Sequence, residues 1–246
     1  MNDLRPRVLV VEDHAADRVL CERAFGTVDY IPTFSQLETA IGVGEQWDLA
    51  FVDFHLGEQV PSGLSAMRSL LASGCKVVAY TPMGESGRTL FAAAARHWLG
   101  VKLVVSKDFA SESVLRAYAV AALTGAQAPT PRNIANQMHN AQLIDRLILN
   151  GERLRMWRLL HHFAGAETPI SRELGISRRT LNEWKADALD AVLDVLEKLF
   201  GQPRPPEGDR RNFAILLNFA SEHRMFFFAV DLPKFVDERR TDGPTA

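Results

Sequence analysis

Hydrophobic and polar positions alternate in blocks over the first half of the chain, where short apolar runs are followed by longer amphipathic segments. Leu49 to Val52 form one such run, which has no internal alternation and ends at Asp53. Short continuous apolar runs between polar residues are typical of strands buried on both faces, as in parallel sheets. We predict five such strands, at residues 7–11, 28–34, 47–53, 76–81 and 101–105.

The segments between these strands carry apolar residues at helical spacing. Val19 is expected on the buried face of the first helix, while Ser35 and Ser86 are candidate caps for helices over 36–43 and 87–97. Strands that alternate with helices predict a doubly wound α/β fold, in which helices cover both faces of a five-stranded parallel sheet. In that fold the carboxyl ends of all strands open at one edge.

The pattern changes after residue 124, where small residues and two prolines stop the helical periodicity. We predict an N-terminal domain over 1–124, a linker over 125–131 and an all-α domain over 132–246. Apolar spacing predicts helices in that second domain at 133–148, 152–163 and 186–200, with apolar segments at 213–219 and 225–230. We expect the C-terminal extension after residue 200 to complete a core, with a dimer surface or a cover over another face as alternatives.

Composition narrows the class of protein. The chain has 246 residues, 47% of them hydrophobic and 24% charged, with a net charge of -2, which is ordinary for globular material. The charge is too balanced to establish a nucleic-acid partner. Cys21 and Cys75 fit a reducing compartment better than a disulfide framework. We find neither an apolar signal core nor a run long enough to span a membrane, so we expect a cytoplasmic protein with no membrane partner.

Polar residues with complementary chemistry follow four of the predicted strands. Glu12 and Asp13 end the first, Asp53 the third, Thr81 the fourth and Lys107 the last. Neighbouring carboxylates repel one another without a cation, and oxygen ligands suit Mg²⁺. A hydroxyl and an ammonium beside them suit a transferring phosphoryl group, for which a carboxylate is the natural nucleophile.

These residues, in this order, make residues 7–123 similar to the receiver domain of two-component response regulators, which has a flavodoxin-like fold. The resemblance implies phosphorylation of Asp53 by a sensor histidine kinase, with Thr81 and Lys107 contacting the phosphoryl group. It also implies a Mg²⁺ cofactor, with these ligands: Glu12, Asp13, Asp53 and the backbone carbonyl of His55.

Two positions depart from the family pattern. Val104 stands three residues before the lysine, where the family usually has an aromatic residue that moves when the threonine engages the phosphoryl group. Pro82 follows the hydroxyl, where the family prefers a small residue. These departures bear on phosphotransfer and on its coupling to output, while the acceptor residues themselves match.

Residues 167–186 have the spacing of a helix-turn-helix. Gly175 can take the positive φ of a tight turn, and Ser177 can cap the second helix. The segment resembles the DNA-binding output domain of LuxR/NarL-type regulators. By that resemblance the second helix reads DNA, with Arg179, Asn182 and Glu183 as the expected base readers. The outward residues expected at the interface are Ser177, Arg178, Arg179, Thr180, Asn182, Glu183 and Lys185.

The leading hypothesis is a DNA-binding transcriptional response regulator that acts as a homodimer on double-stranded promoter DNA. One alternative is a phosphorylation-independent regulator, suggested by Val104 and Pro82. Another is a receiver-based interaction protein that does not bind DNA. We do not expect an enzyme, because the second half has no cluster of residues at metal or nucleophile spacing, and the adjacent His161 and His162 face different sides of a helix.

Overall fold

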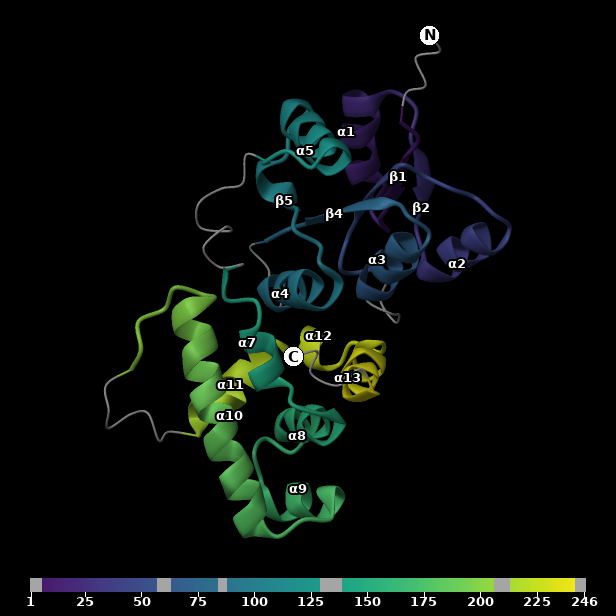
Figure 1. Cartoon of the computed structure of the whole chain (residues 1–246). Helices are drawn as coiled ribbons and strands as arrows, with labels where there is room; N and C mark the ends of the chain where they lie inside the picture. The colour runs from purple at the N-terminus through teal and green to yellow at the C-terminus, as the bar shows by residue number, and fades with distance from the viewer. Residues whose placement is uncertain (1–5, 57–62, 84–87, 129–138, 206–212, 242–246) are drawn as a thin grey trace. The chain divides into compact units, whose positions relative to one another are not determined.

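A computed structural model describes the chain over residues 6–56, 63–83, 88–128, 139–205 and 213–241 (Figure 1). The chain divides into two compact units, residues 1–135 and residues 136–246. The first unit is built around a sheet, whereas the described part of the second is helical. The expected linker at 125–131 lies partly outside the described residues.

The first unit contains a five-stranded parallel sheet with the order β2-β1-β3-β4-β5. This confirms the predicted flavodoxin-like sheet, because the order reverses once at β1, as in doubly wound folds of that type. Each residue of β1 and β3 is buried, which explains their continuous apolar sequences. The strands are β1 (Val8–Val11), β2 (Asp29–Ile31), β3 (Leu49–Val52), β4 (Lys76–Thr81) and β5 (Val104–Ser106).

Helices cover both faces of this sheet. α1 and α5 pack together on one face, and α3 packs beside α2 and α4 on the other (Figure 1). The face under α1 and α5 is filled by aromatic and branched side chains, with Phe51 between Phe25 and Tyr80. The helices are α1 (Ala15–Phe25), α2 (Phe34–Gly42), α3 (Gly63–Ala72), α4 (Arg88–Leu99) and α5 (Glu112–Thr124).

Some local predictions for this unit were wrong. Thr33 caps α2 in place of Ser35, because its hydroxyl accepts a hydrogen bond from the Gln36 amide at 3.3 Å. Val19 is 44% exposed, since α1 presents Cys21 and Ala24 to the core. The predicted cap Ser86 lies outside the described residues.

The second unit is all-α over its described residues. α8 contacts α9, α11, α12 and α13, while α10 contacts α7, α9 and α11 (Figure 1). The predicted helix over 133–148 is described only from residue 139, and it is helical at Leu143–Leu147. The helices are α7 (Leu143–Leu147), α8 (Gly151–His162), α9 (Glu167–Leu174), α10 (Arg178–Lys198), α11 (Ala214–Glu222), α12 (Arg224–Phe227) and α13 (Leu232–Thr241).

The extension after residue 200 contributes directly to the core of this unit. Trp157 on α8 is fully buried and stacks on Phe227 of α12 with ring centroids 4.7 Å apart. Phe219 of α11 packs against the same indole at 5.9 Å. The Arg158 guanidinium also donates hydrogen bonds to the backbone carbonyls of Phe227 and Ala229. Core completion, the default expectation for this extension, therefore agrees with the structure.

Neither unit has a helix, among the described residues, that combines the length and apolarity needed to cross a bilayer. Cys21 and Cys75 are both buried and carry no disulfide. Burial raises the pKa of each thiol to about 12. Both cysteines therefore serve as small apolar core residues in their thiol form.

His223 makes the stability of the second unit depend on pH. It is 4% exposed, packs against Phe200 and Phe219, and its Nδ1 finds no hydrogen-bond partner among the described residues. Burial lowers its pKa from 6.5 to about 4. The unfolded chain therefore takes up the proton first, and stability present above pH 6.5 is lost as the pH falls toward 4.

We expect the free energy of unfolding to fall by about 3 kcal/mol over this range from His223 alone, at about 1.4 kcal/mol per pKa unit. Urea denaturation at pH 7.5 and pH 4.0 measures this loss, and His223→Leu should remove most of it. His162→Leu is the matched control, because that histidine is exposed. An equal pH dependence in wild type and His223→Leu would contradict the assignment.

Candidate functional site

Asp53 lies directly after β3, at the carboxyl edge of the sheet, and is 3% exposed. Its Oδ1 accepts hydrogen bonds from the backbone amide of Phe54 at 2.6 Å and from the Thr81 hydroxyl at 2.8 Å. Its Oδ2 accepts a hydrogen bond from Lys107 Nζ at 2.7 Å. The structure thus brings together Asp53, Thr81 and Lys107, three of the residues singled out in the sequence.

Lys107 is held by several carboxylates. Its Nζ contacts Glu12, Asp17 at 2.9 Å and Asp53 at 2.7 Å. Burial lowers the pKa of Lys107, but the charges of Asp53 and Glu12 and its hydrogen bonds to them outweigh burial and raise it above the usual range. Burial also raises the pKa of Glu12, to about 7, with the charge of Asp53 acting in the same direction. The site therefore combines a permanently charged ammonium with a carboxylate that is costly to ionise.

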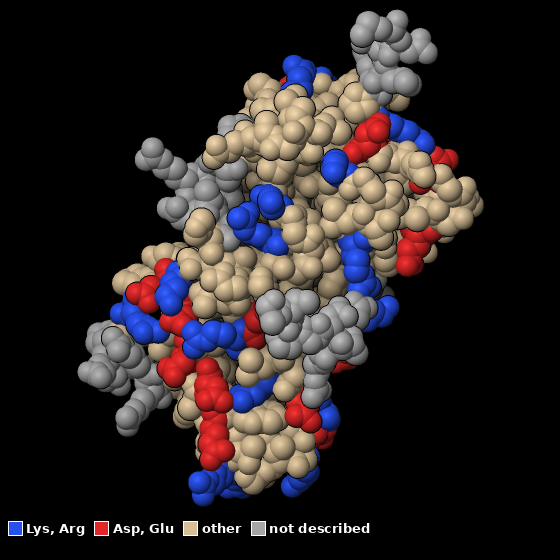
Figure 2. Space-filling model, viewed as in Figure 1, with Lys and Arg blue, Asp and Glu red and all other residues tan. Residues whose placement is uncertain are grey.

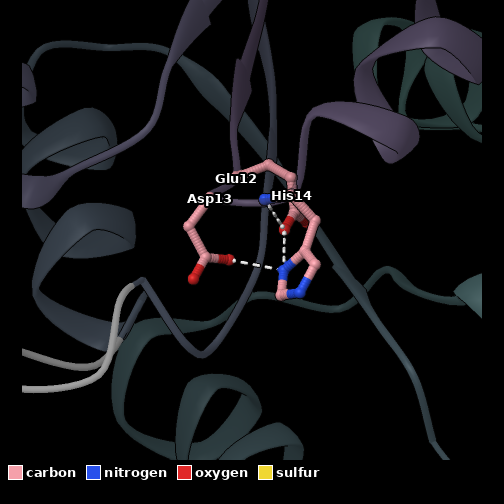
Figure 3. Close-up of side chains that lie close together, drawn as sticks. All are labelled: Glu12, Asp13 and His14. Atoms are coloured by element: carbon pink, nitrogen blue, oxygen red, sulfur yellow. Dashed lines mark hydrogen bonds and ion pairs between the residues drawn. The ribbon is translucent and has the colours of Figure 1, made fainter.

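An acidic group beside this lysine has the donor chemistry of a metal site. Glu12, Asp13 and His14 each place one ligand atom within 4.8 Å of the others (Figure 3). The Asp13 carboxylate and the His14 ring nitrogen lie 3.0 Å apart, and the Glu12 carboxylate accepts a hydrogen bond from the His14 amide. Carboxylate oxygens are the ligands that Mg²⁺ prefers, so Glu12 and Asp13 fit such an ion. The role predicted for the His55 carbonyl stays a prediction.

Arg88 is a site residue that the sequence did not reveal. It is the first residue of α4 and 5% exposed, and its guanidinium donates a hydrogen bond to Asp53 Oδ1 at 2.9 Å. A cation at a helix N-terminus opposes the helix dipole, so no local rule predicts an arginine there. Asp17, in the first turn of α1, contacts Lys107 and was also missed.

Glycine at position 63 is needed for the backbone to approach this site. The Gly63 amide donates a hydrogen bond to the Phe54 carbonyl at 2.6 Å. A Cβ at this position would come 1.8 Å from the backbone oxygen of Asp53, so no other residue fits without movement of the backbone. The start of α3 is thereby fixed against the segment that carries Asp53.

The second unit contains the two helices and turn predicted at 167–186. α9 ends at Leu174 and is followed by Gly175, whose φ of 68° gives the left-handed turn, and α10 begins after Ser177. The Ser177 hydroxyl caps α10 by accepting a hydrogen bond from the Thr180 amide at 3.0 Å. Ile170 and Leu181 are fully buried and join the two helices to the core. α10 then continues to Lys198, so the candidate recognition segment is the first part of a long helix.

Most of the expected contact residues face solvent. Arg178, Arg179, Asn182 and Glu183 are exposed, and Figure 2 shows Lys and Arg side chains at the lower end of this unit, over α9 and the first turns of α10. The Arg179 side chain is 90% exposed and forms an ion pair with Glu183 at 3.1 Å. Exposed pairs of this kind contribute little and separate easily, so Arg179 remains able to bind an anion.

Lys185 does not lie on the outward face, and this expectation was wrong. It is 5% exposed, and its Nζ donates a hydrogen bond to Glu167 at 2.9 Å and lies 4.3 Å from the ring of Phe213. Its long aliphatic stem lets the ammonium reach partners across the interior side of α10. Lys185 thus joins α10 to the start of α9, and it is not a candidate for contact with a ligand.

Known proteins were compared with this chain by sequence and by structure. No family model matches the chain, and no curated protein matches its sequence. Among solved structures, RcsB from Salmonella enterica serovar Typhimurium bound to promoter DNA matches with a TM-score of 0.55 and 16% identity, over 89% of this chain and 98% of that chain. This chain shares the fold of that RcsB structure.

Two further solved structures match over most of their length. A second promoter complex of RcsB from the same organism has a TM-score of 0.46 and 15% identity, over 88% of this chain and 98% of that chain. Full-length FixJ from B. japonicum has a TM-score of 0.41 and 19% identity, over 90% and 98%.

Proposed function

We propose that this protein is a DNA-binding transcriptional response regulator in which Asp53 accepts a phosphoryl group. One observation carries the proposal: Asp53, Thr81 and Lys107 converge at the carboxyl edge of the sheet, within reach of the acidic group Glu12 and Asp13. A nucleophile, a hydroxyl donor and a buried cation in one place are what phosphoryl transfer to a carboxylate requires. The RcsB match supports the same function at the level of fold.

The chemistry follows from these groups. An Asp53 oxygen attacks phosphorus as the bond to the leaving group breaks, and the leaving group departs with the electron pair. The Thr81 hydroxyl donates a hydrogen bond to a phosphoryl oxygen, and Lys107 compensates its charge. Glu12, Asp13 and Asp53, with the His55 carbonyl, would hold Mg²⁺, which when bound neutralises negative charge on the phosphoryl oxygens. The physiological donor in this proposal is a sensor histidine kinase in the cytoplasm.

We expect incubation with acetyl phosphate and Mg²⁺ to add one phosphoryl group to the chain. Intact mass spectrometry detects this adduct, and Asp53→Asn should abolish it because the amide is not a competent nucleophile. Asp48→Asn is the matched control, since Asp48 is an exposed carboxylate at the other end of β3. An adduct that persists in Asp53→Asn would assign phosphorylation to another residue.

DNA binding is proposed for the first turns of α10, with Arg179, Asn182 and Glu183 as base readers and Ser177, Arg178 and Thr180 on the backbone. Arg179→Ala should weaken binding to the cognate promoter duplex by about 1–3 kcal/mol and relax its sequence preference. Fluorescence anisotropy with the cognate and a scrambled duplex, at two salt concentrations, measures both effects. Arg224→Ala, an exposed arginine on α12, is the control.

A homodimer on DNA is the expected binding form, and light scattering with and without duplex tests it. If Arg178→Ala and Arg179→Ala both leave DNA affinity unchanged, the second unit is better explained as a protein-interaction module.

A phosphorylation-independent regulator is the second candidate, favoured by the ion pair of Arg88 with Asp53, which neutralises the acceptor carboxylate without phosphorylation. The mass experiment above separates that candidate from the first.

A further inference from the structure

Arg88 is a buried cation in α4, shielded from the solvent that would otherwise stabilise its charge. It is buried at the first position of α4, a helix whose first turn has no acidic residue. A cation near the start of a helix is repelled by the helix dipole, and a buried guanidinium is stable only beside compensating anions. Asp53 is one such anion, with Arg88 Nη1 and Asp53 Oδ1 2.9 Å apart.

The ion pair with Arg88 lowers the reactivity of Asp53 as a nucleophile and as a metal ligand. Its Oδ1 accepts hydrogen bonds from Arg88, Thr81 and the amide of Phe54, while Oδ2 is held by Lys107. A carboxylate oxygen offers about two lone-pair directions, and an attack on phosphorus needs one of them. Two cations on one carboxylate also lower its attraction for a third, so Arg88 and a divalent ion compete for Asp53.

We propose that Arg88 is an inhibitory counter-ion: it holds Asp53 unreactive, and it must leave the carboxylate before Asp53 binds Mg²⁺ or accepts a phosphoryl group. This inference rests on the proposed phosphoacceptor function. In the step itself, the guanidinium withdraws, an Asp53 oxygen forms the bond to phosphorus, and the leaving group takes the electron pair of the broken bond. Because Arg88 belongs to α4, each phosphorylation event also releases the first turn of that helix from β3.

The contact between Arg88 and Asp53 connects α4 to the site without a moving aromatic residue. Val104, at the position where receiver domains usually carry that residue, is buried in β5 and has no polar group to engage Thr81. The Arg88 side chain spans from α4 to the acceptor itself. The state of Asp53 is therefore reported to α4 by an ion pair that forms or breaks.

The test uses the full chain with Arg88→Gln, which keeps a hydrogen-bond donor but removes the charge. We expect the initial rate of phosphorylation by acetyl phosphate, measured by intact mass at subsaturating Mg²⁺, to rise about tenfold, because no charge-assisted hydrogen bond must break. In the absence of any phosphodonor, the Mg²⁺ concentration that half-saturates the increase in thermal unfolding temperature should fall by a similar factor. Arg96→Gln, on the last turn of α4, is the matched control and should match wild type in both measurements.

Each outcome decides the proposal. If wild type is phosphorylated and folded Arg88→Gln is no faster, the counter-ion role is overturned while the phosphoacceptor function stands. If neither protein forms an adduct, the phosphoacceptor function fails. The Mg²⁺ titration then tests the role of Arg88 alone, and a half-saturating Mg²⁺ concentration that is the same in wild type and Arg88→Gln overturns the counter-ion role. If Arg88→Gln does not fold, Arg88→Met removes the charge while filling similar volume, and an unchanged rate and Mg²⁺ affinity in that variant overturn the proposal.

Discussion

Asp53→Asn should lower the free energy of unfolding by about 3–5 kcal/mol in the wild-type chain and by much less in an Arg88→Met background. Removing the carboxylate charge takes away the anion that lies 2.9 Å from the buried Arg88 guanidinium. Lys107 tolerates the same change better, because it keeps Glu12 and Asp17 as partners. We expect a large part of the penalty to pass through the Arg88–Asp53 pair, and methionine at position 88 removes the buried charge of that pair while filling similar volume.

Urea denaturation of the wild type, both single variants and the double variant, without Mg²⁺, gives the coupling energy. Asp48→Asn in the same two backgrounds is the control, and it should cost the same in each because Asp48 is exposed and contacts the Arg7 amide. Additive effects of Asp53→Asn and Arg88→Met would show that the buried pair contributes nothing specific to the native state.

Much of the first unit could be predicted from its sequence because the deciding signals are local. Continuous apolar runs define β1 and β3, and polar residues at their ends mark the edge where Asp53 and Thr81 meet. The residue that caps α2 could not be predicted in the same way. Thr33 and Ser35 are both good N-caps, and only the path of the chain into α2 selects Thr33.

The parts that could not be predicted depend on partners distant in the sequence. Arg88 finds Asp53 across 35 residues, and Lys185 finds Glu167 across 18. A long basic side chain has no periodic signature that distinguishes a buried pair from a solvated one, because its stem packs in either case. The contact of Asp53 with Thr81 and Lys107 was therefore predictable, whereas its ion pair with Arg88 was not.

Truncating Trp157 tests whether the C-terminal extension is part of the second core. Trp157→Ala should lower the free energy of unfolding by about 3–5 kcal/mol, the usual range for removing a fully buried aromatic side chain. The indole stacks on Phe227 and packs against Phe219, and its Nε1 donates a hydrogen bond to the Leu147 carbonyl at 2.9 Å. Its loss therefore removes contacts with α11 and α12 and leaves a buried carbonyl oxygen unpaired.

Phe227→Ala should cost a similar amount, since it opens a cavity on the other side of the same stack. Trp184→Ala is the matched control: that indole is half-buried on α10, and its main contact is with the Arg153 guanidinium, 4.5 Å from the ring. Chemical denaturation followed by far-ultraviolet circular dichroism measures all three variants. If Trp157→Ala and Phe227→Ala are no more destabilising than Trp184→Ala, the helices after residue 213 do not support the helix-turn-helix, and the second unit is stabilised without its extension.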